Sequence, residues 1–164
     1  PFEVVPGISA FQAAAAKLRV ELTVPGLVQS IILTRISGRT EVPTTEELAS
    51  LAAHRASLCL YLSARHVEQA QAQLLQHYSA STPVAICFRL GWQDEQIWLV
   101  PLEQMAAVTQ QKDLIRTTLY VISPALAATT IPNEYFDETV ERDGEKRRSR
   151  LYNPSHSHLF RQAD

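Results

Sequence analysis

The sequence predicts an α/β domain in which a mixed β-sheet is flanked by helices. Short runs rich in apolar and β-branched residues alternate with segments in which apolar residues recur at helical spacing. Two of these runs, 83–90 and 96–100, are separated only by the polar loop 91–95, so we expect an antiparallel hairpin within the sheet. The chain of 164 residues is long enough for one domain with a substantial core.

The N-terminal elements are a short strand, an alanine-rich helix and a second strand. Residues 2–5 are predicted to be the end of a strand that a Pro-Gly pair interrupts. The helix is predicted over 8–18, with Ser9 near its start. The next strand is predicted over 27–34, where β-branched residues are frequent.

The central elements alternate between helix and strand. Pro43 precedes two threonines and two acids, which is typical of a helix start because such side chains satisfy free N–H groups and favour the helix dipole. That helix is predicted to end near Arg55. The run 58–62 is continuously apolar, as expected of a strand covered on both faces. The remaining predicted elements are a helix over 67–78, the hairpin strands, a helix over 102–111 and a strand over 117–122.

These elements divide the chain into three segments. Residues 1–6 are expected to be the end of an upstream N-terminal domain and its linker. Residues 7–124 form the predicted α/β domain. Residues 125–164 include a long stretch that is charged and poor in apolar residues, so we expect a flexible C-terminal tail.

The composition excludes several classes of partner. The chain is 46% hydrophobic and 20% charged, and its net charge of −2 provides no basic field that would attract nucleic acid or a membrane surface. No apolar run approaches the ~20 residues of a membrane-spanning helix. Cys59 and Cys87 lie in apolar, strand-like runs, so we expect core thiols in a reducing, cytoplasmic compartment.

The most informative motif is a loop with two arginines after the strand over 27–34. Arg35 and Arg39 lie on either side of Gly38. Polar loops at strand ends are where α/β proteins place ligand chemistry, and each guanidinium presents planar donors suited to carboxylate or phosphate. The loop predicts a ligand with several acidic groups, but surface salt bridges around an ordinary strand end explain the spacing equally well.

A second motif, Val-Val-Pro-Gly-Ile-Ser at residues 4–9, is a strand–turn–helix junction. Glycine allows a ligand to approach the backbone closely, and the first N–H groups of a helix are free donors. The junction is therefore either part of a ligand site or only a tight turn.

No motif identifies a reaction. The chain lacks a G-x-S-x-G nucleophile motif and a glycine-rich phosphate loop. The basic run 146–150 lacks the interleaved aromatic residues of nucleic-acid binding, and His156 and His158 have no nearby cysteine or carboxylate to complete a metal site. We therefore name no catalytic residue and no metal ligand.

Taken together, these motifs resemble the tetrapyrrole methylases, and within that family the C11-methyltransferases of corrin (vitamin B12) synthesis. Residues 4–9 resemble the junction that links the two domains throughout the superfamily. Residues 32–40, followed by Val42 and Pro43, resemble the segment that marks the C11 branch. Further matching segments follow in the family's order: 60–63, 83–85, Trp92 with Asp94 and Glu95, and 149–152.

The resemblance implies a function. The chain is similar to the C-terminal domain of an S-adenosylmethionine-dependent enzyme that methylates C11 of precorrin-4 or cobalt-precorrin-4. In such relatives the cofactor lies between this domain and an N-terminal domain that carries its own glycine-rich loop. The implied partners are an acidic tetrapyrrole substrate, the protein's own N-terminal domain and a second copy in a homodimer.

The resemblance also assigns residues by position. Leu62 and Thr117 are implied on the cofactor side, although both read equally well as core positions. The run 89–93 departs from the family, whose members usually have a small residue, Ser or Thr, and then Trp-Pro, so Leu90 would narrow a pocket wall. The full implied set for the cofactor is Ser9, Ala10, Leu62, Leu90 and Thr117, and for the substrate carboxylates Arg35, Arg39 and Arg89.

Two alternatives stay open at this point. The first is a sister methylase that acts on uroporphyrinogen III, another precorrin or the diphthamide precursor of a protein, against which the two-arginine segment argues. The second is a dimerisation or binding module without methyl transfer. A glycine-rich cofactor loop upstream of residue 1 would favour the enzyme over the module.

Overall fold

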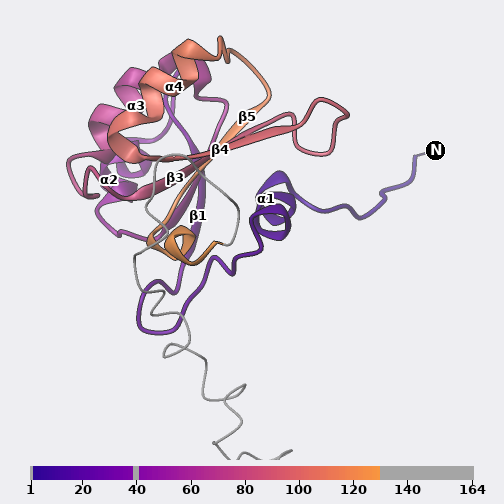
Figure 1. Cartoon of the computed structure of the whole chain (residues 1–164), viewed down its shortest axis with the longest axis horizontal. Helices are drawn as coiled ribbons and strands as arrows, with labels where there is room; N and C mark the ends of the chain where they lie inside the picture. Colours follow the sequence, from indigo (N-terminus) through magenta and orange to yellow (C-terminus); the bar gives the residue numbers. More distant parts are fainter. Residues whose placement is uncertain (1, 39–40, 130–164) are drawn as a thin grey trace, which may run out of the picture.

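A computed structural model describes residues 2–38 and 41–129 of the chain. Within these residues a five-stranded mixed sheet lies between two unequal layers, with three helices over one face and a single α-helix over the other (Figure 1). The strands are β1 (Ile31–Arg35), β2 (Ser57–Tyr61), β3 (Pro83–Phe88), β4 (Gln96–Pro101) and β5 (Thr118–Ile122). The α-helices are α1 (Ala10–Leu18), α2 (Leu48–Ala52), α3 (Val67–Leu74) and α4 (Met105–Gln111), with short 3-10 helices η1 (Thr44–Glu46), η2 (Ala64–His66), η3 (Leu102–Gln104) and η4 (Pro124–Ala128).

The topology confirms the predicted mixed sheet and its hairpin. The strand order is β1-β2-β5-β3-β4, in which β1 and β2 are parallel and every other neighbouring pair is antiparallel. Strands β1, β2 and β3 therefore end at the same edge of the sheet at which β4 and β5 begin. We call this the site edge; it is marked by Arg35, Tyr61, Phe88, Gln96 and Thr118.

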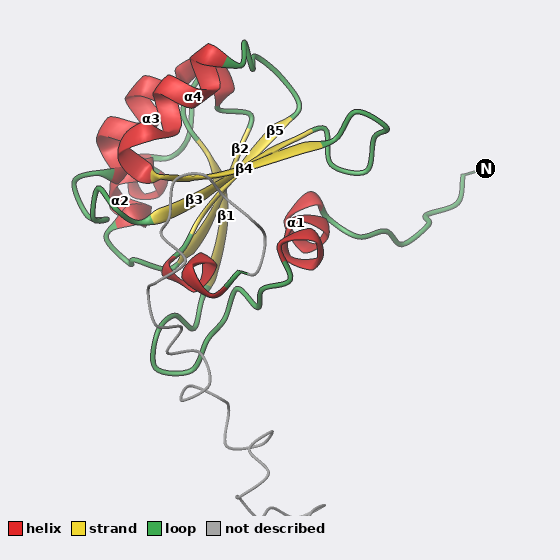
Figure 2. Ribbon diagram, in the orientation of Figure 1, coloured by secondary structure: helices red, strands yellow, loops and turns green. Residues whose placement is uncertain are grey.

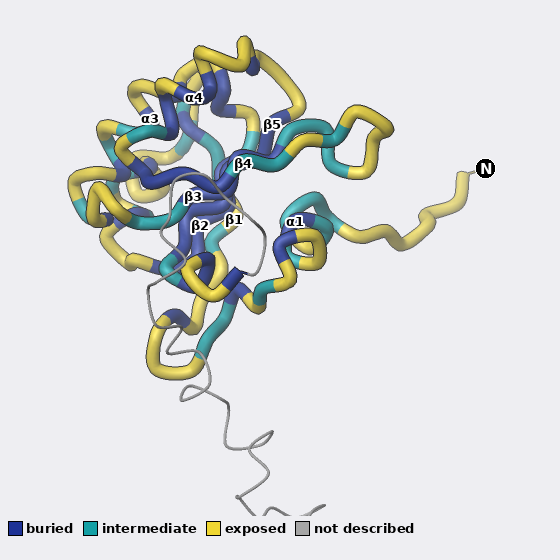
Figure 3. The backbone as a smooth tube through the Cα atoms, viewed as in Figure 1, coloured by how far each residue is buried: buried dark blue, intermediate teal, exposed yellow. Residues whose placement is uncertain are grey.

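The larger core lies between the sheet and the layer of α2, α3 and α4 (Figure 2). Strand residues alternate between the two faces, so Tyr120 and Ile122 of β5 point into this core while Leu119 and Val121 point into the other. All four are buried, which explains why the central strands are continuous apolar runs. Figure 3 shows this burial concentrated in the strands and in the inner sides of the helices.

The smaller core lies beneath α1 and η4. It contains Leu18 of α1, Leu126 of η4 and both cysteines, all almost fully buried. Burial raises the pKa of the Cys59 thiol to about 12, and that of Cys87 further, so both remain protonated and unreactive at neutral pH. The expectation of free core thiols is confirmed, since both cysteines are unpaired and buried.

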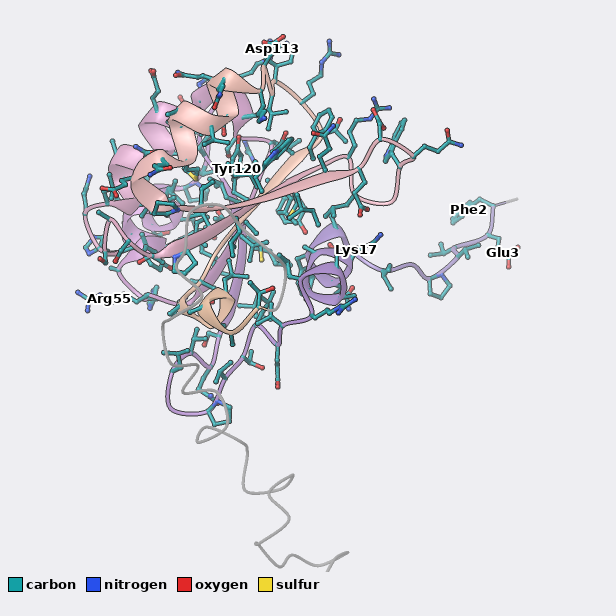
Figure 4. The ribbon with its side chains drawn as sticks, in the orientation of Figure 1. Phe2, Glu3, Lys17, Arg55, Asp113 and Tyr120 are labelled. Atoms are coloured by element: carbon teal, nitrogen blue, oxygen red, sulfur yellow. The ribbon has the colours of Figure 1, made fainter. Side chains whose placement is uncertain are left out.

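Several predicted boundaries are wrong for identifiable reasons. Residues 2–5 form no strand; they are exposed, and the segment runs away from the domain (Figure 4). The strand predicted over 27–34 begins only at Ile31, because an isolated bridge between Val24 and Val28 closes a turn around Gly26, whose φ is 73°. The helix predicted from Pro43 to Arg55 is divided, since the extended Glu47 separates η1 from α2.

Three predicted strands extend one or two residues too far in the same way. The predictions over 58–62, 83–90 and 117–122 each include a residue with positive φ that the structure places just outside the strand. These residues are Leu62, Arg89 and Thr117, and all three lie at the site edge. A change to the left-handed region ends a strand, and for these residue types the sequence carries no signal for it.

The ordered domain continues beyond the predicted boundary at residue 124. Leu126 is fully buried, and the Thr129 hydroxyl donates to the Leu18 carbonyl over 2.6 Å, which attaches η4 to the end of α1. Residues 125–129 therefore belong to the packed domain. The basic run 146–150 and the histidines 156 and 158 lie outside the described residues.

Candidate functional site

The site edge gathers most of the residues that the sequence assigns to ligands. The start of α1, the ends of β1, β2 and β3 and the start of β5 meet there. It therefore brings Ser9 and Ala10 to the same side of the sheet as Arg35, Leu62, Arg89, Leu90 and Thr117. Arg39 lies outside the described residues.

The start of α1 is attached to the sheet by a phenol. The N–H of Ser9 donates to Gln12 Oε1 over 2.9 Å, which satisfies one terminal donor of the helix. The N–H of Phe11 donates to the Tyr61 hydroxyl over 3.1 Å, and that hydroxyl lies 3.0 Å from Ser9 Oγ. Tyr61 is the last residue of β2, so its ring fixes the first turn of α1 against the site edge.

Backbone strain distinguishes this edge. Leu62, Arg89 and Thr117 have φ values of 55°, 51° and 54°, a region that costs about 1–3 kcal/mol outside glycine and is exceptional for a β-branched residue such as threonine. The other described non-glycine residues with positive φ, Arg19, Arg55 and Asp113, follow the C-terminal ends of helices, where that conformation is common.

The ends of helices thus explain the positive φ angles of Arg19, Arg55 and Asp113. They do not explain those of the three residues at the site edge. There the N–H of Arg89 donates to the carbonyl of Thr117 over 2.9 Å and holds two of the strained residues together. Leu62 is 81% exposed and Thr117 is also exposed, so the reading of either as a core position is wrong. Leu90 is half-buried and packs against the core under α1.

Two hydrogen bonds connect the start of the arginine loop to the residues that follow it. Arg35 donates from Nη2 to the Glu41 carbonyl over 3.2 Å, and Ser37 Oγ accepts from the N–H of Val42 over 3.2 Å. Residues from β1, this loop and Tyr61 line a shallow cavity of about 390 Å³. Its lining is Leu33, Thr34, Arg35, Glu41, Val42, Pro43, Glu46 and Tyr61.

Arg89 lies on the other side of the edge and is engaged by the hairpin loop. Its Nη1 lies 2.6 Å from Asp94 Oδ2, and its guanidinium stacks 4.3 Å from the centre of the Trp92 ring. Two strands, β2 and β5, separate β1 from β3, so Arg35 and Arg89 start roughly 14 Å apart at ~4.8 Å per strand. A ligand that spans this separation could contact both arginines.

The hairpin loop is also held against α1. Glu95 accepts from the N–H of Gly91 over 2.7 Å and forms an ion pair with Lys17 at 2.9 Å. The Gly91 N–H first, and Lys17 second, lower the pKa of the Glu95 carboxyl below its ordinary value. These contacts connect the end of α1 to the loop that carries Trp92 and Asp94.

The sequence analysis missed the residues that join these parts. Tyr61 and Ser63 flank Leu62, and both hydrogen-bond to elements far away in the sequence. Two signals were available: the change from apolar to hydroxyl side chains at the end of the strand over 58–62, and the resemblance of segment 60–63 to the family. Among the described residues no group of three or more His, Cys, Asp or Glu side chains is arranged to hold a metal ion. Nor does any helix in the described part of the chain have the length and apolar character to cross a membrane.

The comparisons with known proteins identify the class to which this fold and edge belong. Residues 1–106 match the model of the Tetrapyrrole (Corrin/Porphyrin) Methylases, and the chain belongs to this family. The family resemblance inferred from the motifs is thereby confirmed.

Within the family the chain is similar to enzymes of one branch. It is 37% identical over 161 residues to a precorrin-4 C(11)-methyltransferase of Pseudomonas aeruginosa, covering 98% of this chain and 58% of that protein. It is 34% identical over 125 residues to a cobalt-precorrin-4 C(11)-methyltransferase of Methanocaldococcus jannaschii, covering 76% of this chain and 48% of the relative.

A solved structure agrees. The crystal structure of a cobalt precorrin-4 methyltransferase, described as a cobalamin biosynthetic enzyme, superposes with a TM-score of 0.73 at 33% identity over 76% of this chain and 52% of the other. The chain thus spans about half the length of the relatives that it matches.

Proposed function

We propose that this chain is the C-terminal half of an S-adenosylmethionine-dependent methyltransferase that acts on C11 of precorrin-4 or cobalt-precorrin-4 in cobalamin biosynthesis. The observation that carries the proposal is the similarity to C11-methyltransferases over almost the whole chain, including the two-arginine segment. The site edge supports it, because the described residues of the set implied by that resemblance lie along this edge.

The reaction transfers a methyl group from a sulfonium to a nucleophilic ring carbon. The S–C bond of the donor breaks as the new C–C bond forms, and the sulfur keeps the electron pair as a neutral thioether. An electron-rich tetrapyrrole carbon needs no covalent help, so catalysis comes from in-line placement and exclusion of water. This accounts for a site edge without an obvious nucleophile or general base.

The cofactor side of the site comprises the start of α1 and the strained strand ends. Ser9, Ala10, Leu62, Leu90 and Thr117 would contact the adenosyl group of S-adenosylmethionine largely through backbone atoms. Backbone contact explains why residues as different as leucine and threonine serve there. The positive φ angles support this role, because strain of this kind persists where the surroundings hold a special backbone geometry.

The substrate side comprises the arginines. Arg35 and Arg39 would bind the acetate and propionate groups of the tetrapyrrole through charge-assisted hydrogen bonds. Arg89 is the third candidate, and it would exchange Asp94 for a substrate carboxylate. The separation of Arg35 from Arg89 suits a macrocycle with carboxylates around its rim.

Two protein partners complete the proposal, together with a cytoplasmic location. The protein's own N-terminal domain would cover the site edge, where the large apolar side chains of Ile8 and Leu62 are 77% and 81% exposed. A homodimer would cover the outer side of β1, an edge strand of the described sheet on which Leu33 is 50% exposed.

Product analysis tests the proposal. The intact protein is incubated with methyl-labelled S-adenosylmethionine and, separately, with precorrin-4, cobalt-precorrin-4 and uroporphyrinogen III. We expect label at C11 of one or both precorrin-4 substrates, and the preferred one tells whether cobalt is already in the ring. Turnover of uroporphyrinogen III alone would identify a sister methylase, and absence of methyl transfer to any tetrapyrrole would favour a binding module.

A further inference from the structure

We propose that Tyr61 and Ser63 are positioning residues that align the two sides of the site independently, Tyr61 the cofactor side and Ser63 the substrate side. Neither residue belongs to the sets that the family resemblance implies. The inference rests on the proposed function, and it concerns how one short turn controls two ligand-binding segments.

The turn Tyr61-Leu62-Ser63 has a geometry that allows this division. The exposed Leu62 lies between the two hydroxyl residues with a φ of 55°, so the chain bends directly after β2. The Tyr61 side chain packs in the core under α1. Ser63 is fully buried and bonds instead to the segment that follows β1. One turn thus contacts elements about 50 residues upstream on one side and 27 residues upstream on the other.

Tyr61 acts on the cofactor side. Its hydroxyl accepts from the N–H of Phe11 and lies 3.0 Å from Ser9 Oγ, so it determines where the first turn of α1 lies relative to Leu62. Among the proposed cofactor contacts, Leu62 follows Tyr61 directly in the chain. Ser9 and Ala10 belong to the segment that the Tyr61 hydroxyl contacts. Loss of the hydroxyl leaves the ring in the core but removes these two polar contacts with the start of α1.

Ser63 acts on the substrate side. Its hydroxyl donates to the Tyr61 carbonyl over 2.7 Å and accepts from the N–H of Ile36 over 3.2 Å. Ile36 follows Arg35 directly, so this bond sets the direction in which the arginine loop leaves β1. The loop also lies close to η2, because a Cβ atom added at Gly38 would lie 3.4 Å from Nε2 of His66.

Matched controls lie at the opposite edge of the same sheet. Ser57, at the other end of β2, is equally buried, and its hydroxyl donates to the Leu22 carbonyl over 2.6 Å. Tyr78 donates to the Ala56 carbonyl over 2.7 Å. Ser57→Ala and Tyr78→Phe therefore remove comparable hydrogen bonds from the same domain, far from the proposed ligands.

The experiment compares four variants of the intact protein. The dissociation constant for S-adenosylhomocysteine is measured by calorimetry, and the KM for the tetrapyrrole by methyl transfer. We expect Tyr61→Phe to raise the cofactor constant about threefold to tenfold with a smaller rise in the tetrapyrrole KM, because Tyr61 also lines the cavity beside Arg35. We expect Ser63→Ala to raise the tetrapyrrole KM by a similar factor with the cofactor constant almost unchanged. Both controls should lower thermal stability without changing either constant.

Two results would overturn the inference. One is an equal change of both constants in both variants, and the other is a similar change in the controls, since either would indicate a general loss of structure. Hydrogen exchange decides the question even if the intact protein methylates no tetrapyrrole. We expect faster exchange in the first turn of α1 for Tyr61→Phe and after Ile36 for Ser63→Ala. Unchanged exchange at both places would refute the positioning role.

Discussion

At the scale of single residues, Arg35 and Arg39 are the clearest targets. We expect Arg35→Ala and Arg39→Ala to raise the KM for the tetrapyrrole while the affinity for S-adenosylhomocysteine stays close to that of the unmodified protein. Charge-assisted, bidentate contacts support a loss of roughly 1.5–3 kcal/mol for each. Arg55→Ala is the control, because Arg55 follows α2 at the opposite edge of the sheet (Figure 4). An unchanged KM in both arginine variants would remove the loop from the substrate site.

A buried cysteine and a buried tyrosine predict how the stability of the fold changes at alkaline pH. Burial raises the pKa of Cys59 from 9.0, and of Tyr120 from 10.0, to about 12 in each case. Above pH 9 the unfolded chain therefore loses protons that the folded chain keeps, so the free energy of unfolding should fall as the pH rises from 9 toward 12. Urea titrations at pH 8 and pH 10.5 measure this fall. Cys59→Ala should reduce the fall in unfolding free energy between these two pH values. An equal fall in that variant would exclude Cys59 as a contributor.

At the scale of elements, η4 contributes buried residues to the smaller core. Leu126 fills the core under α1, so Leu126→Ala should cost about 2–5 kcal/mol of unfolding free energy through the cavity that it leaves. Leu75→Ala is the matched control, because Leu75 follows α3 and is 37% exposed. Urea denaturation of the two variants compares them. Equal and small losses would mean that residues after 124 do not contribute to the core.

At the scale of the whole molecule, the chain spans about half the length of its relatives, so under the proposed function it supplies one side of the site. We expect residues 1–164 to fold alone, because the described part has two buried cores, but to bind S-adenosylmethionine weakly and to transfer no methyl group. Calorimetry with the isolated chain and with the intact protein makes the comparison. Micromolar cofactor affinity of the isolated chain would contradict a site that needs both halves.

Local patterns in the sequence were sufficient to predict the fold class, the hairpin and the buried thiols, whereas the family was inferred from the resemblance of several motifs. These properties depend on hydrophobic period, composition and short motifs, which involve residues close together in the chain. The two-arginine loop is the best example, since its chemistry alone is compatible with either an anion site or surface salt bridges. Its occurrence with further motifs in a known order is what indicates the family.

The way in which the site is joined together depends on tertiary structure. Leu62, Arg89 and Thr117 lie within predicted strands, yet in the structure all three have left-handed backbone, which their residue types do not favour. A hydrogen bond across the sheet, from the N–H of Arg89 to the carbonyl of Thr117, joins two of them. Tyr61 and Ser63 acquire their roles from hydrogen bonds to Phe11 and Ile36, which are distant in sequence. Such positions are set by the packing of β1, β2 and α1 around one edge, and no local pattern encodes that arrangement.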